Sequence, residues 1–329
     1  MNAILGVDVG ATTIAAGLVT HAGEVLQTVQ RPTHVNGAGT VVKTLLALVE
    51  ELVTVADQRG LVLDGVGVGV PGVVDVARGM ISVAPPGNRV RELRDVPIAE
   101  EILRITGLPA FVENDANALA LAESMFGVAR GARSLVLFAI GTEIGGGLVL
   151  DGHLVRGARG LAGELHSVPV KFDGARCRCG GRGCLGAYVG GRVIAEEARR
   201  QVASGTRSSV VALAGGDADA VTSRQVFQAA ALGDPLARAV VDGVCDALAA
   251  GIGAVIGCFD PEVVVVTGGV AQSLVPLADE VRRRAADYSM PLEVPPTRIE
   301  IVSGDKGQSV RGGAALFLYH RSLGRPTRG

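Results

Sequence analysis

The 329-residue chain contains no tryptophan, and aromatic residues make up only 3% of it. Aromatic side chains are the usual stacking platforms for nucleobases, and no basic block accompanies the net charge of −2, so nucleic-acid binding is disfavoured. No uninterrupted apolar run approaches the ~20 residues that a membrane span needs. The chain has no basic leader, and Asp8 interrupts its first apolar segment, which argues against a secretory signal. We therefore expect a soluble cytoplasmic protein that contacts neither nucleic acid nor membrane.

Aliphatic residues and glycine dominate what is present. Hydrophobic residues make up 48% of the chain, so the core must be built from valine, leucine, isoleucine and alanine. The 47 glycines follow no collagen-like period, and we interpret them as tight turns and places where the backbone approaches another group closely.

Strands and helices are expected to alternate along the chain. Apolar runs that end in turns predict strands, and apolar residues recurring every three to four positions predict helices, as at Val42, Leu45, Val49, Leu52 and Ala56. The expected strands cover residues 3–10, 13–20, 24–31, 64–72, 262–269 and 298–304. The expected helices cover residues 40–60, 95–107 and 308–323, and residues 110–127 pass from a strand into a helix. This alternation predicts an α/β fold with mostly buried sheets.

One part of this pattern occurs twice. Residues 134–157, SLVLFAIGTEIGGGLVLDGHLVRG, resemble residues 3–26, AILGVDVGATTIAAGLVTHAGEVL, with a turn about one residue shorter. Each copy reads as a strand, a glycine-threonine turn and two further strands. We therefore expect two related α/β domains, residues 1–115 and 116–306.

The glycine turns of the two copies are candidate phosphate-binding loops. The first holds Asp8, Gly10, Thr12 and Thr13, and the second holds Gly141 and Thr142. Backbone N–H groups and hydroxyls in such turns can cradle phosphate oxygens, and Asp8 could hold Mg²⁺ through water. Either turn taken singly is as well explained by a tight hairpin, but two matched turns favour a phosphate clamp. A third turn, at Gly268 and Gly269, suits the close approach of a flat ring such as adenine.

Acidic and amide side chains stand at one predicted junction of a strand and a helix. The sequence VENDANALA places Glu113, Asn114 and Asp115 there. Asp115 could be a helix N-cap, the commonest role of Asp at such a position. The ends of strands are also where α/β proteins keep their catalytic groups, and we favour that interpretation.

Three cysteines form a compact C-x-C-x4-C cluster at Cys177, Cys179 and Cys184, eleven residues after His166. Cytoplasmic thiols stay reduced, so a metal site is favoured over disulfides. A tetrahedral zinc site requires soft thiolates close together, and incidental cysteines are the weaker alternative. Cys245 and Cys258 fall in an expected helix and are interpreted as core residues.

Four segments together resemble the ROK (repressor, open reading frame, kinase) family: LGVDVGATTIAAGLV, VENDANALALAES, GTEIGGGLVLDGHLVRGARGLAGE and CRCGGRGCLGAY. The resemblance implies a two-domain actin-like sugar-kinase fold, which is ribonuclease H-like, closing over a cleft. Residues 307–323 would then form a helix that packs back on the first domain. Family members phosphorylate hexoses such as glucose, N-acetylmannosamine or fructose with ATP and Mg²⁺. Others are repressors with an added helix-turn-helix, for which this chain leaves no room before its first strand.

The resemblance assigns roles to individual residues. Asp115 matches the base that takes the proton of the attacking hydroxyl, and Asn114 matches a residue that holds neighbouring hydroxyls. The phosphate turns match at the positions named above, and Gly268 with Gly269 matches the turn near adenosine. The other expected sugar contacts are Asn88, Glu164, His166 and Ser167. The three cysteines, with His166 as a candidate fourth ligand, match a structural zinc site in which Gly180 and Gly183 recur.

The chain departs from the family pattern on the sugar side. The family reads Gly-Glu-hydrophobic-Gly-His, whereas here His166 stands at the glycine and Ser167 at the histidine. The glutamate that follows Cys-Leu is replaced by Gly186. The fourth zinc ligand is therefore open between His166, after a one-residue slip, and water or another group. The loss of two hydrogen-bonding groups predicts that glucose is a poor substrate.

A last departure is Glu143, which stands in the second phosphate turn where the family has glycine. Its carboxylate would repel ATP unless Mg²⁺ or a basic group offsets it, or unless it faces solvent. We expect an ATP-dependent kinase acting on a primary hydroxyl, with a valiolone-type C7-cyclitol or an amino sugar as substrate. Glucokinase and a non-catalytic sugar-sensing regulator are the alternatives. The resemblance and the apolar composition also predict a homodimer.

Overall fold

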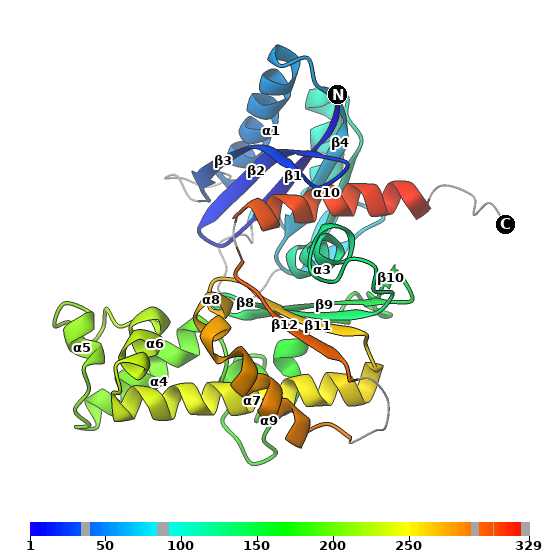
Figure 1. The fold of residues 1–329 in the computed structure, drawn as a ribbon. Helices are drawn as coiled ribbons and strands as arrows, with labels where there is room; N and C mark the ends of the chain where they lie inside the picture. The colour runs from blue at the N-terminus through cyan, green and yellow to red at the C-terminus, as the bar shows by residue number, and fades with distance from the viewer. Residues whose placement is uncertain (34–39, 84–91, 291–295, 305, 324–329) are drawn as a thin grey trace. The chain divides into compact units, whose positions relative to one another are not determined.

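The computed structural model describes residues 1–33, 40–83, 92–290, 296–304 and 306–323, and its contacts divide the chain into two compact units (Figure 1). The first unit contains residues 1–133 and 147–163 with the C-terminal helix α10 (Lys306–Leu323). The second contains residues 134–146 and 164–304. This division lies later than the predicted boundary at residue 116, because helix α3 (Asp115–Phe126) packs against α10 and stays with the first unit.

A five-stranded sheet forms the centre of the first unit. Its strand order is β3-β2-β1-β4-β7, in which β1, β2 and β3 pair antiparallel while β4 and β7 join β1 in parallel. The bounds are β1 (Asn2–Val9), β2 (Thr13–Thr20), β3 (Val25–Pro32), β4 (Val62–Val70) and β7 (Ala110–Asn114). The first three strands are those expected from the sequence, each within one or two residues.

The second sheet repeats this order. It runs β10-β9-β8-β11-β12, so that a consecutive group of three strands is again extended by two parallel ones. The bounds are β8 (Leu135–Ile140), β9 (Ile144–Leu150), β10 (His153–Leu154), β11 (Val263–Thr267) and β12 (Arg298–Ile301). The internal repeat seen in the sequence is therefore present as two sheets of one topology.

The alternating glycines and valines of β4 have opposite surroundings. Val66, Val68 and Val70 are fully buried in the core cluster under helix α1 (Thr40–Gln58). The glycines between them face the other side, where a Cβ on Gly67 would collide with the backbone of α10 at Gly313. Glycine is therefore required in β4 because α10 lies directly on the sheet.

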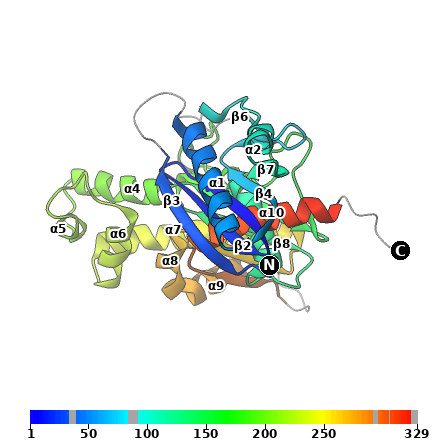
Figure 2. The same ribbon diagram turned by 90° about the horizontal axis from the view of Figure 1, so that it is seen from above.

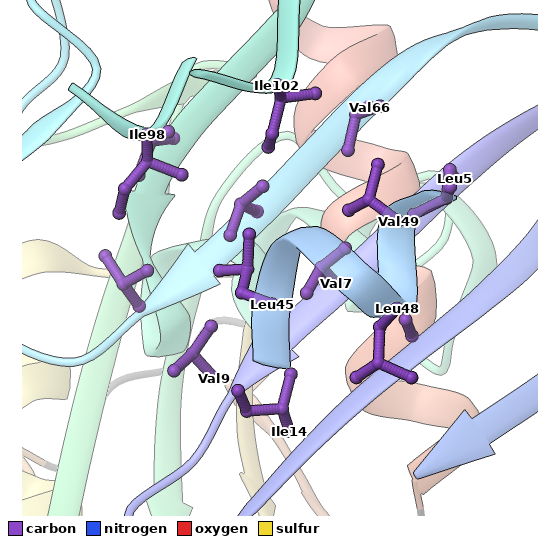
Figure 3. Close-up of a cluster of buried hydrophobic side chains, with 14 of the residues drawn as sticks. Leu5, Val7, Val9, Ile14, Leu45, Leu48, Val49, Val66, Ile98 and Ile102 are labelled. Atoms are coloured by element: carbon purple, nitrogen blue, oxygen red, sulfur yellow. The ribbon is translucent and has the colours of Figure 1, made fainter. Parts of the chain in front are cut away.

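Helix α1 covers the opposite face of the first sheet. In Figure 2 it lies across the strands, and Figure 3 shows Leu45, Leu48 and Val49 of α1 meeting Leu5 and Val7 of β1. The buried stripe also includes Val41, whereas Val42, expected in the stripe, is only half-buried. The stripe is rotated because the 3.6-residue period lets positions 41, 45, 48, 49 and 52 share one face.

Helices pack together in the second unit. Helices α4, α6 and α7 contact one another, and α9 packs on α7 and β12 (Figure 1). Their bounds are α4 (Gly191–Ala203), α5 (Val210–Leu213), α6 (Ser223–Ala231), α7 (Pro235–Phe259), α8 (Ala271–Leu274) and α9 (Ala278–Asp287).

The remaining elements are β5 (Val73–Asp75), β6 (Met80–Val83), α2 (Ile98–Thr106), and the 3-10 turns η2 (Leu165–Ser167), η3 (Leu185–Ala187) and η4 (Val275–Leu277).

Helix α7 holds the two remaining cysteines. Cys245 is buried as expected, but Cys258 is exposed, because it lies in the last turn of the helix, beyond the core contacts. Among the described residues, α7 alone is long and apolar enough to cross a membrane, and 61% of its most apolar window is buried inside the protein. That burial is what the core helix of a globular domain shows.

Candidate functional site

The first glycine turn, Gly10–Thr12, joins β1 to β2 and is fixed through its main chain. The Gly10 N–H donates to the Thr13 carbonyl at 3.0 Å. Thr33, which is fully buried, donates its hydroxyl to the Gly10 carbonyl at 2.7 Å and its N–H to the Thr12 carbonyl at 3.0 Å. Asp8, the second-last residue of β1, lies close to this turn in the sequence and is half-buried. Thr33 was not predicted as part of this turn, since it lies 23 residues from Gly10.

The second turn, Gly141–Glu143, joins β8 to β9 and is held differently. The Gly141 N–H donates to the Glu143 carbonyl at 2.9 Å, so the closing bond encloses one residue fewer than in the first turn. The start of α4 supplies two further donors. The Gly191 N–H binds the Gly141 carbonyl at 2.8 Å, and the Arg192 N–H binds the Thr142 carbonyl at 3.1 Å. A helix N-terminus, whose first N–H groups lack partners within the helix, therefore fixes this turn.

The third turn, at Gly268 and Gly269, lies against the second. The Val270 N–H donates to the Ile140 carbonyl at 2.9 Å, at the end of β8. Gly268 has φ +103°, and a Cβ there would come within 2.6 Å of the Ile140 carbonyl, so only glycine fits. A Cβ on Gly269 would meet no atom within 4 Å. The second unit therefore brings together both of its predicted nucleotide-binding turns.

Glu143 is enclosed by arginines. Arg192 donates from Nε to Oε1 at 2.7 Å and from Nη2 to Oε2 at 3.3 Å, and Arg178 donates from Nη1 to Oε1 at 3.1 Å. These hydrogen bonds to Glu143 raise the pKa of Arg192 further above its usual value. Two of the possibilities left open for this carboxylate therefore hold together: arginines offset its charge, and its side chain, 54% exposed, faces solvent.

Asn114 and Asp115 stand at the junction of β7 and α3, and their roles there differ. Asn114 is the N-cap: its Oδ1 accepts from the N–H groups of Ala116 at 2.9 Å and Asn117 at 3.1 Å, and its Nδ2 donates to the Gly72 carbonyl at 3.1 Å. Asp115 is the first residue of the helix, and its Oδ1 accepts from the Ala116 N–H at 2.8 Å. The capping role considered for Asp115 therefore belongs to Asn114.

A buried ion pair supports this junction from behind. Glu113, only 2% exposed, accepts at Oε1 from the Asn114 N–H at 2.8 Å and at Oε2 from Arg156 Nε at 2.6 Å. Arg156 also lies over the Tyr319 ring of α10, and its Nη2 is 3.4 Å from His320 Nε2. Burial, and then the charge of Arg156, lower the pKa of His320. Contacts among β7, Arg156 and α10 of the first unit thus fix the backbone next to Asp115.

Glu164 directly precedes η2, which contains His166 and Ser167. Ser167 donates its hydroxyl to the Glu164 carbonyl at 2.7 Å, and His166 Nδ1 lies 3.0 Å from Glu164 Oε2. That hydrogen bond to Glu164 raises the pKa of His166. A Cβ on Gly186 would come within 3.2 Å of the His166 Cβ, so a histidine at 166 and a glutamate at 186 would crowd each other. Asn88, the remaining predicted sugar contact, lies outside the described residues.

The three cysteines of the cluster converge. The Sγ atoms of Cys177, Cys179 and Cys184 all lie within 4.8 Å of one another, and those of Cys179 and Cys184 are 3.6 Å apart. Three thiolates this close fit a tetrahedral zinc ion. Gly180, at φ +94°, allows the tight turn between them. Within the described residues His166 is not part of this group, and its Nδ1 is directed to Glu164 instead.

Comparison with known proteins identifies the family. The ROK family model matches residues 4–320. The chain belongs to the ROK family. It is 36% identical to a glucokinase from Thermotoga maritima over 292 residues, 88% of each chain. The structure of a ROK family glucokinase from Streptomyces griseus, in complex with glucose and AMPPNP, is 30% identical, with a TM-score of 0.79 over 95% of this chain and 98% of that one.

A ROK family transcriptional regulator, a homologue of the E. coli MLC protein, is 28% identical, with a TM-score of 0.82 over 98% of this chain and 78% of that one. The predicted actin-like α/β fold and the identification as an ATP-dependent sugar kinase of the ROK family are confirmed by these matches.

Proposed function

We propose that the protein transfers the γ-phosphate of ATP to a primary hydroxyl of a sugar-like substrate, with Asp115 as the general base. The observation that carries this proposal is the junction of β7 and α3. Asn114 caps the helix and the buried Glu113–Arg156 pair fixes the backbone, so that Asp115 is held at a defined position in the first turn of α3. A positioned carboxylate can accept the proton of the hydroxyl as it attacks phosphorus.

In this proposal the glycine turns bind the nucleotide. Gly10, Thr12 and Thr13 are the proposed phosphate contacts of the first unit and Gly141 and Thr142 those of the second, and Asp8 would hold Mg²⁺ through water. Gly268 and Gly269 lie against the adenosine, supported by the contact of their turn with the end of β8. Little covalent chemistry is asked of the protein, because positioning and charge neutralisation supply most of the rate in phosphoryl transfer.

The sugar-side residues support a substrate other than glucose. The Ser167 hydroxyl is turned to its own backbone, and Gly186 offers no side chain, so two polar groups of the family pattern are missing. Each lost hydrogen bond weakens glucose binding by ~1–3 kcal/mol. We propose a valiolone-type C7-cyclitol, phosphorylated on its exocyclic hydroxymethyl group, as the first candidate and an amino sugar as the next. In this proposal Glu164, His166 and Asn88 contact the ring of the substrate.

Glucose is the second candidate, and it is supported by similarity along the chain and by one retained residue of the sugar side. The glucokinase from Thermotoga maritima is similar over nearly the whole chain, and Glu164 is retained. A coupled assay of ADP release across glucose, N-acetylmannosamine, glucosamine and valiolone separates the candidates. We expect kcat/KM for glucose to be at least about tenfold below that for the best cyclitol or amino sugar. A highest value for glucose would contradict the cyclitol proposal, and ligand binding without turnover would favour a regulator.

We further propose that Cys177, Cys179 and Cys184 hold one structural zinc ion per chain. The convergence of their Sγ atoms supports this, and His166 would have to leave Glu164 to become the fourth ligand. The ion would stabilise the loop that follows Glu164. A homodimer in the cytoplasm stays a prediction, which sedimentation at micromolar concentration tests: a monomer alone would contradict it.

A further inference from the structure

Glu143 places a negative charge in the turn proposed to bind ATP phosphates. Its side chain is about half exposed, at 54%, and it follows Gly141 and Thr142 directly. A carboxylate this close to phosphate repels it, and the repulsion is weakened only where a cation lies beside the carboxylate. The surroundings of Glu143 therefore decide whether the turn can accept a nucleotide.

Arg192 is the better fixed of the two cations beside Glu143. Its guanidinium binds both oxygens of Glu143, from Nε at 2.7 Å and from Nη2 at 3.3 Å. Its Nη1 binds Glu196 one turn further along α4, at 2.6 and 2.8 Å. Its main-chain N–H also donates to the Thr142 carbonyl. Arg192 is thus joined to the turn through both its main chain and its side chain, and the side chain is only 24% exposed.

Arg178 is a weaker second cation. It lies between Cys177 and Cys179, donates one hydrogen bond to Glu143 at 3.1 Å, and is 61% exposed. Exposed pairs of this kind contribute little, because solvent and salt screen them. Replacing Arg192 should therefore affect Glu143 more than replacing Arg178.

We propose that Arg192 is a positioning residue for the nucleotide: it holds Glu143 against the start of α4 and neutralises its charge, so that the second turn can accept the phosphates of ATP. Arg178 contributes a smaller share of the same effect. This inference rests on the proposed kinase function. It assigns Arg192 no contact with substrate, because its donors are occupied by Glu143 and Glu196.

The test is a double-mutant cycle on the full chain, with Mg²⁺–AMPPNP binding measured by calorimetry and KM for ATP measured in the kinase assay. Arg192→Ala is expected to weaken nucleotide binding roughly tenfold, because it leaves Glu143 uncompensated. Glu143→Ala should bind the nucleotide at least as tightly as the wild type. The Arg192→Ala/Glu143→Ala double variant should return to within about threefold of the wild type. A merely structural role for Arg192 would not be rescued by removing its partner.

Arg200→Ala is the matched control, since Arg200 lies on the same helix and pairs with Glu197, away from the turn. It should leave nucleotide binding unchanged. The Arg192→Ala defect should also shrink as ionic strength rises. If Arg192→Ala does not fold, Arg178→Ala replaces it: we expect a two- to threefold weakening, on the order of an exposed pair, that is absent when Glu143 is alanine.

The outcomes separate this inference from the proposed function. A wild-type protein that binds no Mg²⁺–AMPPNP would overturn both. A wild type that binds, with a double variant as weak as Arg192→Ala, would overturn the inference alone and would assign Arg192 to the phosphates themselves. Weaker binding by Glu143→Ala would also overturn it, because Glu143 would then be needed for the nucleotide.

Discussion

The two turns proposed to bind phosphate come from the same repeated unit, yet they are stabilised by different means. The first turn is fixed by Thr33, a buried residue whose hydroxyl donates to the Gly10 carbonyl and whose N–H donates to the Thr12 carbonyl. The second is fixed by the N-terminus of α4, and it carries Glu143 with its two arginines. Two sheets with the same strand order can therefore hold their turns by different contacts. The first turn is held by the buried, uncharged Thr33, and the second by the N-terminus of α4 and a partly exposed group of charged side chains.

Among the changes that separate the two turns, crowding the second turn should have the largest effect on KM for ATP. In Gly190→Ala the new Cβ lies 3.2 Å from the Thr142 carbonyl, at a backbone φ of +126° that non-glycine residues adopt only with strain. We expect a loss of about 1–3 kcal/mol in stability and at least a tenfold rise in KM for ATP. Gly205→Ala is the control, because Gly205 also has positive φ but has nothing within 4 Å of its Cβ position. Equal ATP kinetics in the two variants would show that the contact with Thr142 is unimportant.

Removing the support of the first turn should have the next largest effect. Thr33→Val keeps the shape of the side chain but leaves the partly buried Gly10 carbonyl without its hydroxyl donor. The expected cost is about 1–2 kcal/mol in stability, together with a several-fold fall in kcat/KM for ATP. Thr54→Val serves as the control, since that hydroxyl binds the Glu50 carbonyl on an exposed face of α1. Thermal unfolding and initial rates measure both effects. If Thr33→Val has the same stability and the same ATP kinetics as Thr54→Val, Thr33 does not support the first turn.

Metal removal should give the smallest effect, and one specific to the second turn. Arg178 sits between two of the cysteines, so loss of order in this loop should release its hydrogen bond to Glu143. Chelation is expected to weaken Mg²⁺–AMPPNP binding about two- to threefold in the wild type and to change it little in Arg178→Ala. Metal analysis of protein purified without added zinc should find one zinc ion per chain. A folded, metal-free protein would contradict the zinc proposal.

The sequence predicted what is local. Glu113, Asn114 and Asp115 are consecutive at a strand-helix junction, the phosphate turns are short, and the cysteines span eight residues, so spacing alone brought each group together. The shared topology of the two sheets was visible because the repeated strands are contiguous. The convergence of the three cysteines was equally predictable, since they lie on one loop.

What the sequence left hidden depends on distant segments. Thr33, Arg156 and Arg192 support their turns from 23 to 49 residues away, and nothing near them in the chain signals a partner. Residues 64–72 were correctly expected to form a strand, but its glycines could not be assigned a partner, because α10, which packs on Gly67, lies more than 200 residues later. The exposure of Cys258 likewise depends on where the core contacts of α7 end.

The central claim, that Asp115 is the catalytic base of a sugar kinase, is tested most directly by the turnover of Asp115→Asn. Asparagine preserves the size of the side chain but cannot accept the substrate proton at neutral pH. We expect kcat with the best substrate to fall by about 10²–10⁴, while Mg²⁺–AMPPNP binding measured by calorimetry stays within about threefold of the wild type. A kcat within tenfold of the wild type would contradict the account and would exclude Asp115 as the base.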